Sequence, residues 1–561
     1  MRLRTALALT AVLLGVAAPA QAGDPIMPLS QVKPGMQCTG YTVIRGTAIT
    51  GFGVEIVDVF EQRPAAPAIL VRVSGPAVDE SGVAAGFSGS PIYCDDGQGT
   101  MRNIGAIAEV IGDWGNKLAL ATSIEEILSE PAVPPSGSAR VGASANGQPA
   151  RTPLTVAGLS RPVERALVTA GRRGNRPVIA APKAPAPAGP YEPLRPGSSV
   201  AVGLSSGDLW IGGVGTVAYV DGINAWLFAH PFELAGRRSL LLQDAYVHTV
   251  VANPDPALGS YKLAGPGRDI GTTTNDALAA VVGQMGTLPR TTDVQVIARD
   301  PDGGRTEQMN LEVADESAVD VPAGYSPLLF IGPLSVAEAS ARILRSIPAR
   351  MSGSMCARLT LVGQPRPLRV CNRYVTQFGG GVGGSMADDL ARAVEAIEWA
   401  EYAPLAVERL DVELDARRGA RQATLTGVSM PRAVRAGQVV TVSLRAKMLR
   451  GPVRRFSFRL RIPRGLARGD HTLTLSGPGA DQAGELGGEL GEIIVFDDEE
   501  EGEEPSGARS FDELEAEVNE IRRWDGVTAR FSGRGGRRVR AYLDPVVRIG
   551  GTVRLRLRVR G

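Results

Sequence analysis

Short runs of β-type residues, separated by Gly and Pro, follow one another through the first part of the chain. Between residues 30 and 130 these runs are YTVIRGTAI, GVEIVDVF, AILVRV, NIGAIAEVI and KLALATSI. Strands of this length at this spacing are typical of small antiparallel barrels and sandwiches. A second β-rich block covers 197–315 and contains Asp221-Gly222 between two apolar runs, which is a hairpin signal. The sequence therefore predicts a mainly β protein in which two β blocks face each other across a cleft.

The 561 residues are too many for a single hydrophobic core, so the chain is expected to form several domains. Residues 131–196 are rich in Pro, Ala, Gly and Arg, a composition typical of an extended linker. Capping patterns at Ser335 and Ser385 predict two helices, and the alternation in VVTVSLRAKM predicts an immunoglobulin-like β-sandwich. In chain order, we predict a signal peptide (1–22), a first β-barrel half (23–130), a linker (131–196), a second β-barrel half (197–315), a small mixed α/β region (316–404), a β-sandwich (405–497), and an acidic linker, helix and Arg-rich strands (498–561).

The first 22 residues have the form of a secretory signal. Two arginines precede an apolar stretch, and Ala20-Gln21-Ala22 forms an A-x-A cleavage site. No later run reaches the roughly 20 apolar residues that cross a bilayer, so we expect a secreted or periplasmic protein without a transmembrane segment after signal removal. The 60 Lys and Arg nearly cancel the 59 Asp and Glu, so no global field attracts nucleic acid, and no nucleic-acid partner is expected.

The four cysteines are Cys38, Cys94, Cys356 and Cys371. An oxidising compartment favours disulfides, and four cysteines allow three pairings. We favour Cys38 with Cys94 and Cys356 with Cys371, because each pair flanks segments that resemble neighbouring strands. Cys-x-x-Cys spacing and nearby histidines, which a zinc site needs, are missing from the sequence, so neither a metal nor another cofactor is expected.

A serine surrounded by small residues follows the apolar run AILVRV, in the stretch GFSGSPIY. One interpretation is a tight structural turn. The other is a nucleophile on a sharp loop, because acyl transfer needs an activated hydroxyl and N–H donors that meet the developing oxyanion. In that interpretation Ser88 is the nucleophile, and the N–H groups of Gly86 and Ser88 form the oxyanion hole.

Three histidines are candidates for the base that such a serine needs. His471 lies in a Gly-Asp-His loop and is interpreted as a surface residue. His248 alternates with apolar residues and is interpreted as a solvent-facing strand residue. His230 follows the apolar run AWLF and precedes a proline, so it marks the end of a strand, where a base is often held on a loop. The alternative for His230 is a buried structural histidine whose ring nitrogens are hydrogen-bonded inside the fold.

The segments GFSGSPIY and GTVAYVDGINAWLFAHPF resemble the two signature regions of the SpoIVB-type sporulation serine peptidases. The resemblance covers about residues 28–310 and implies a trypsin-like site on a two-barrel fold, with Ser88 and His230 in its serine and histidine motifs. Phe87 stands where the family usually has Met, and Ala229 where it usually has Gly. In the family the histidine block comes first, whereas here it comes second, so the domain resembles a circular permutation, which leaves triad geometry possible.

The third member of a triad is the least defined by the sequence. The family's aspartate lies shortly before its serine motif, where this chain has Val73-Ser74-Gly75-Pro76. Asp276, downstream of His230, is the preferred acid, and Asp79 is the second choice.

These features predict an exported serine endopeptidase that hydrolyses peptide bonds in a protein or peptide of the cell envelope. The alternative, from another class, is a catalytically inactive envelope binding or scaffold protein that retains the peptidase fold. A carboxylate within hydrogen-bond reach of His230, with His230 close to Ser88, distinguishes the two.

Overall fold

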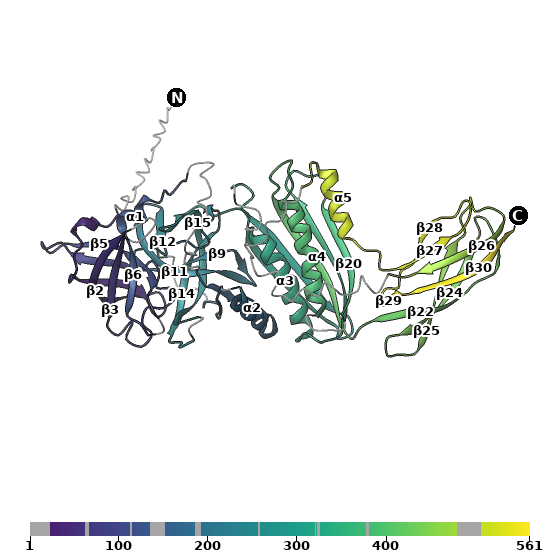
Figure 1. The fold of residues 1–561 in the computed structure, drawn as a ribbon, viewed down its shortest axis with the longest axis horizontal. Coiled ribbons are helices and arrows are strands. Elements are labelled where there is room, and N and C mark those ends of the chain that lie inside the picture. Colours follow the sequence, from purple (N-terminus) through teal and green to yellow (C-terminus); the bar gives the residue numbers. More distant parts are fainter. Residues whose placement is uncertain are drawn as a thin grey trace, which may run out of the picture.

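The computed structural model describes residues 23–61, 67–112, 115–134, 152–174, 176–185, 192–255, 258–319, 321, 326–376, 381–478 and 507–560. The predicted signal peptide and the acidic run Asp497–Glu504 lie outside these residues. Strands make up 49% of the described residues and helices 15%, so this part of the protein is mainly β, as expected. Two β-barrels, a sheet covered by helices and a β-sandwich follow one another along the long axis (Figure 1).

The first barrel is a closed ring of six antiparallel strands in the order β1-β2-β3-β6-β5-β4. The first of the two disulfides, Cys38–Cys94, joins residues directly opposite each other on β1 and β4. The short helix α1 (Ile124–Ser129) follows the last strand, and the Ser123 hydroxyl caps it by accepting from the Glu126 amide. The strands are β1 (Gln37–Val43), β2 (Ile49–Glu61), β3 (Pro67–Ser74), β4 (Pro91–Asp95), β5 (Met101–Val110) and β6 (Leu118–Ser123); the short 3₁₀ helix η1 (Leu29–Gln31) precedes them.

The second barrel also closes. Its strands pair in the order β12-β16-β15-β14-β9-β11, and β11 pairs back with β12. Its strands are β9 (Ser199–Gly203), β11 (Trp210–Asp221), β12 (Asn224–Leu227), β14 (Leu241–Val251), β15 (Tyr261–Asp276) and β16 (Val281–Met285), with β13 (Gly236–Arg237) paired to β15.

Part of the predicted linker is folded, which corrects the expectation of an extended segment. Strand β7 (Leu154–Ala157) pairs with β11, β8 (Val178–Ala180) pairs with β7, and helix α2 (Arg161–Arg173) connects them. Leu154, Val163 and Leu167 from this segment are buried in the main core. These short elements were not predicted because the segment is rich in Pro, Ala and Gly and shows no clear apolar periodicity. Each element is stabilised by its packing on the barrel.

The third unit is a six-stranded sheet in the order β10-β18-β17-β21-β19-β20. Helix α3 packs on β17, β18 and β21, and α4 packs on α3, β19 and β20. The elements are β10 (Ser205–Gly207), β17 (Thr291–Asp300), β18 (Arg305–Ala314), α3 (Pro327–Leu344), β19 (Met351–Leu361), β20 (Leu368–Thr376), α4 (Gly381–Glu398) and β21 (Val407–Arg418). The boundaries predicted at 315 and 405 are therefore misplaced: β17 and β18 belong to this sheet, and β21 joins it by parallel pairing with β17.

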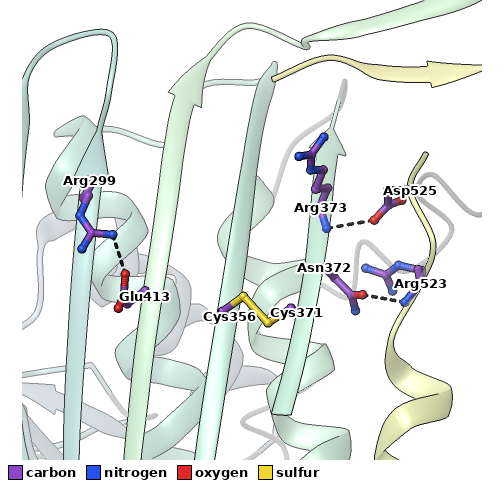
Figure 2. Close-up of a disulfide and its surroundings, with 8 residues drawn as sticks. All are labelled: Arg299, Cys356, Cys371, Asn372, Arg373, Glu413, Arg523 and Asp525. Carbon is purple, nitrogen blue, oxygen red and sulfur yellow. Dashed lines mark hydrogen bonds and ion pairs between the residues drawn. A yellow bond between two sulfur atoms is a disulfide. The ribbon is translucent and has the colours of Figure 1, made fainter. Parts of the chain in front are cut away.

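The second disulfide, Cys356–Cys371, joins opposite residues of β19 and β20 in this sheet (Figure 2). Both disulfides thus have the pairing favoured from the sequence, and they are consistent with an oxidising, extracellular environment. Among the described helices, α3 is the one long and apolar enough to cross a bilayer by length and composition. Of its residues, 89% are buried inside the fold, as is usual for a core helix.

The last unit is a two-sheet sandwich around a single hydrophobic cluster that includes Val442, Leu473 and Leu557. One sheet has the order β25-β24-β22-β29 and the other β23-β30-β26-β27-β28. The Arg-rich C-terminal strands complete this sandwich instead of forming a separate unit, and α5 (Phe511–Ile521) packs on α4 and β20. The strands are β22 (Gln422–Ser429), β23 (Ala433–Arg435), β24 (Val439–Met448), β25 (Val453–Arg461), β26 (Gly469–Ser476), β27 (Val527–Phe531), β28 (Arg538–Tyr542), β29 (Arg548–Gly550) and β30 (Thr552–Arg560).

Candidate active site

The loop that carries Ser88 immediately precedes β4, and two of its glycines have a positive φ. Gly86 has φ +93° and Gly89 has φ +86°, conformations that residues with a side chain rarely adopt. A Cβ on Gly89 would also lie 2.0 Å from the Thr216 carbonyl oxygen. Gly89 is therefore required for the close approach of this loop to the second barrel.

The backbone amides of this loop alternate between donors that are used and donors that are free. Phe87 N donates to Ala84 O, Gly89 N donates to Ile107 O at 2.7 Å, and Ser90 N donates to Phe87 O. Among the hydrogen bonds of the described residues, none uses the amides of Gly86 or Ser88 as a donor. Two free N–H groups on a tight loop provide an anion-binding arrangement of the kind that an oxyanion hole needs.

The side chains of the loop alternate in the same way. Phe87 is fully buried, where its ring packs edge-on against Phe52 in the core of the first barrel. Ser88 is only half-buried, whereas Ser90 is fully buried and its hydroxyl has no hydrogen-bond partner among the described residues. Ser88 is therefore the more accessible of the two serines in the motif.

Strand β11 of the second barrel holds this loop through its backbone. Thr216 N donates to Ser88 O at 2.9 Å, and the Thr216 hydroxyl donates to Gly86 O at 2.9 Å. Lys262 N, on β15, donates to Ala85 O at 2.8 Å. The two segments that carry the predicted serine and histidine, although more than 100 residues apart in the sequence, therefore lie in direct contact.

The backbone that leads to His230 is strained. Phe228 has φ +68° and Ala229 has φ +59°, both in the left-handed region. The Thr122 hydroxyl of the first barrel donates to Ala229 O at 2.8 Å and holds this turn. Left-handed residues with a side chain cost about 1–2 kcal/mol each and cluster at functional sites. This turn places His230 just after the end of β12, next to the first barrel.

The ring of His230 is oriented by a backbone carbonyl. Its Nδ1 lies 2.7 Å from Pro231 O, which can only accept a hydrogen bond, so Nδ1 carries the proton and Nε2 of the neutral ring is an acceptor. Burial lowers the pKa of His230, which favours this neutral form near pH 7. Nε2 therefore has the protonation state that a general base requires.

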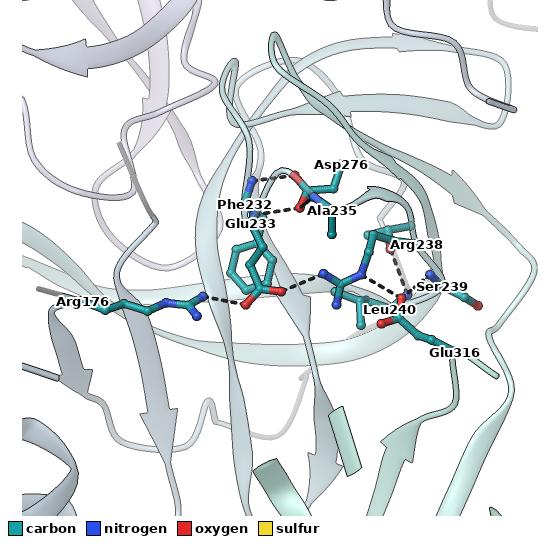
Figure 3. A network of polar contacts seen from close by, with 10 residues as sticks. Arg176, Phe232, Glu233, Ala235, Arg238, Ser239, Leu240, Asp276 and Glu316 are labelled. Atoms are coloured by element: carbon teal, nitrogen blue, oxygen red, sulfur yellow. Dashed lines mark hydrogen bonds and ion pairs between the residues drawn. The ribbon is translucent and has the colours of Figure 1, made fainter. Parts of the chain in front are cut away.

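Among the hydrogen bonds of the described residues, none joins Ser88 Oγ to His230, and none joins His230 to a carboxylate. The second-choice acid, Asp79, forms an exposed ion pair with Lys117 at 2.7 Å. Asp276, the preferred acid, is fully buried and accepts from the amides of Phe232 and Glu233, each at 2.7 Å (Figure 3). Asp276 thus holds the turn that follows His230 rather than the imidazole itself.

Burial raises the pKa of Asp276 to about 6, against the opposing influence of the Arg238 guanidinium and the two turn amides. Arg238 is itself fully buried and pairs with Glu233 at 2.7 Å and with Glu316 at 2.8 Å. Arg176, from the folded part of the predicted linker, pairs with the other oxygen of Glu233 at 2.8 Å. Figure 3 shows this chain of charges running from Arg176 through Glu233 and Arg238 to Glu316.

This network ties the turn after His230 to two distant segments of the chain. Burial would raise the pKa of Glu233, but Arg176 and Arg238 outweigh that effect and hold its pKa below the ordinary value. Removing one partner from such a pair leaves an uncompensated buried charge, which costs about 3–5 kcal/mol. The network therefore fixes the position of the turn that Asp276 caps.

Lys262 is a second buried ionisable group at the site. Its Nζ donates to the Thr216 hydroxyl at 3.0 Å and lies 5.3 Å from the centre of the Phe87 ring. Among the described residues it has no carboxylate partner, and burial lowers its pKa to about 7. A Cβ on Gly86 would lie 3.0 Å from the Lys262 side chain, so this lysine packs directly under the loop that carries Ser88.

The other two histidines lie elsewhere. His248 on β14 is half-buried and packs edge-on against Tyr246, and its buried Nε2 has no hydrogen-bond partner in the part of the chain that the structure describes. His471 was interpreted as a surface residue, and this is wrong: it is 7% exposed on β26, with its ring nitrogens 2.7 Å and 2.8 Å from the carbonyl oxygens of Ser532 and Ala467. It joins two loops of the sandwich.

Sequence reasoning missed Lys262, Thr216, Arg238 and Glu233. None of these residues stands in a spaced pattern, because each acts through partners that are distant in the chain. Only Thr216 had a signal, since it lies inside GTVAYVDGINAWLFAHPF, one of the two segments singled out in the sequence.

Comparison of the chain with protein-family models, with curated proteins and with solved structures finds no match.

Proposed function

We propose that this protein is an exported serine peptidase of the SpoIVB type, with a trypsin-like two-barrel domain in permuted order and a C-terminal sandwich of immunoglobulin type. Its substrates would be proteins or peptides of the cell envelope. The observation that carries the proposal is the loop around Ser88: among the hydrogen bonds of the described residues none uses its Gly86 and Ser88 amides, and the loop is bonded to Thr216 of β11, in the segment that leads to His230.

In the proposed reaction, Nε2 of His230 takes the proton of Ser88 as Oγ attacks the carbonyl carbon of the scissile peptide bond. The amides of Gly86 and Ser88 donate to the oxyanion of the tetrahedral intermediate. The imidazolium then gives its proton to the leaving amine, and a peptide acyl group remains on Oγ. Water, activated by the same nitrogen, hydrolyses this ester and restores the serine.

The role of Asp276 in this proposal is to position the base. It holds the amides of Phe232 and Glu233, and these follow directly on Pro231, whose carbonyl accepts from His230 Nδ1. A carbonyl dipole stabilises the imidazolium less than a carboxylate does, so we expect a slower enzyme than one with a complete triad.

A second candidate function is a binding protein of the envelope that retains the peptidase fold without activity. It is favoured by the lack, among the described residues, of a hydrogen bond between Ser88 and His230 and of a carboxylate on His230 Nδ1.

Labelling of the mature protein with a fluorophosphonate probe distinguishes the two. The peptidase proposal predicts labelling that is lost in Ser88→Ala and in His230→Ala and is retained in Ser90→Ala, the matched control in the same motif. A folded wild-type protein that is not labelled, or labelling that Ser88→Ala leaves unchanged, would support the binding protein instead.

A further inference from the structure

The nearly neutral charge of the chain conceals a strong local imbalance. The two segments that form the sandwich, 419–478 and 526–560, contain 22 Arg and Lys but only 2 Asp and Glu. All but one of the 22 cations are arginines. A domain with this balance has a strongly positive surface potential, whatever the charge of the rest of the chain.

The sheet that contains β30 gathers part of this charge on its outer side, which we call the arginine face. Along β30 the apolar residues alternate with exposed arginines, and the core residues Leu557 and Val559 define the inner side. Residues that lie directly opposite each other on neighbouring strands point to the same side of a sheet, so the strand register shows which residues share the outer side with the β30 arginines. The arginine face comprises Arg435, Arg530, Arg554, Arg556, Arg558 and Arg560.

The four arginines of β30 form a straight row. Successive members are two residues apart, which is about 6.6–6.8 Å, so the row from Arg554 to Arg560 is about 20 Å long. The adjacent strand β26 presents a parallel row of hydroxyls, since Thr472 lies opposite Arg556 and Thr474 lies opposite Arg554. An extended polymer that carries both charges and hydroxyls matches these two rows.

The charges of this surface are largely uncompensated. Among the described residues, the one ion pair on the face is Arg558 with Asp470, at 4.0 Å, and both side chains are more than 70% exposed. Arg530 lies directly opposite a further arginine, Arg538, on β28. Like charges directly opposite each other destabilise a sheet, and a bound polyanion would relieve that repulsion.

The chemistry of the face favours one class of polyanion. Arginine presents a planar fork of donors that matches a carboxylate or phosphate in two parallel hydrogen bonds. Single-stranded nucleic acid needs aromatic platforms for its bases, and the arginine face and its hydroxyl row contain no aromatic residue. The straight row suits an extended chain better than a planar membrane.

We propose that the arginine face binds an extended acidic polysaccharide, with the β30 arginines on its acidic groups and the β26 hydroxyls beside its sugar hydroxyls. This interaction would attach the protein to an anionic polymer outside the cytoplasm. It does not depend on the proposed peptidase activity.

The test measures binding of the full mature chain to fluorescein-labelled polygalacturonate by fluorescence anisotropy. The face variant combines Arg554→Gln, Arg556→Gln and Arg558→Gln. The matched control, Arg445→Gln with Arg455→Gln and Arg459→Gln, removes three exposed arginines from the outer side of the opposite sheet. The acidic run Asp497–Glu504 is the same in all three proteins, and circular dichroism confirms that each is folded.

We expect the face variant to bind about tenfold or more weakly than the wild type, and the control to bind within a factor of about three of it. Affinity should fall as NaCl rises from about 50 to 200 mM, as counterion release requires. Equal losses in both variants would overturn the proposal in favour of unspecific attraction. It would also be overturned by the absence of binding, or by tighter binding to single-stranded DNA or to anionic phospholipid vesicles than to polygalacturonate.

Discussion

The pH dependence of stability tests quantitatively whether the Lys262 amine is buried where the two barrels meet, under the candidate active site. The lysine is 1% exposed, and burial lowers its pKa from 10.5 to about 7. The unfolded chain therefore binds more protons than the folded protein between these two values. The contribution of Lys262 to stability therefore rises with pH across this window, by about 1.4 kcal/mol for each pH unit.

The perturbation is Lys262→Met, which retains a long apolar side chain and removes the charge. Below pH 7 the wild type carries the full cost of a buried ammonium, so the variant should be the more stable protein there. From pH 7 to pH 9 the free energy of unfolding of the wild type should rise by about 3 kcal/mol relative to that of the variant.

The assay is urea unfolding at pH 6, 7.5 and 9, followed by tryptophan fluorescence, to which Trp210 and Trp226 of the second barrel contribute. The variant Lys33→Met, at an exposed position, is the matched control. A difference between wild type and Lys262→Met that is constant with pH would refute the reasoning, because it would mean that the amine is solvated in the folded protein.

Three further predictions concern the turn that carries His230. Ala229→Gly should raise the free energy of unfolding by about 1 kcal/mol, because Gly adopts the left-handed conformation of this position without the cost of a Cβ, and unfolding in urea measures it. Asp276→Asn should lower stability by about 1–3 kcal/mol by removing an acceptor from buried amides, and should slow fluorophosphonate labelling, whereas the exposed Asp79→Asn should change neither. Because burial lowers the pKa of His230, the labelling rate should keep its plateau to below pH 6.5 and fall only as the ring is protonated; a half-maximum above 6.5 would contradict this.

The sequence predicted those parts of the fold that rest on local patterns. Alternating runs between Gly and Pro indicated the strands of both barrels, and the favoured cysteine pairs join strands that are neighbours in the structure. Folded elements without periodicity were missed: β7 is four residues long and is stabilised by pairing with β11. The domain boundary at 315 was misplaced because β17 pairs with β21, more than 100 residues later, and strand pairing over such a distance leaves no local signal.

The candidate site shows the same division. Ser88 and His230 were selected from short motifs and a resemblance, and the structure puts their segments in contact. The partners of these residues could not be predicted in this way. Asp276 was selected by its position in the chain, yet its hydrogen bonds go to backbone amides, and the charges around Arg238 come from three separate segments.

In the proposed reaction, Ser88 is activated by His230 and faces an oxyanion hole. The structure of the mature protein after reaction with a fluorophosphonate tests it most directly. We expect phosphorus on Ser88 Oγ, with one phosphonyl oxygen about 2.7–3.1 Å from the amide nitrogens of Gly86 and Ser88. An unreacted serine, or an adduct whose oxygens make no contact with these amides, would rule out this mechanism.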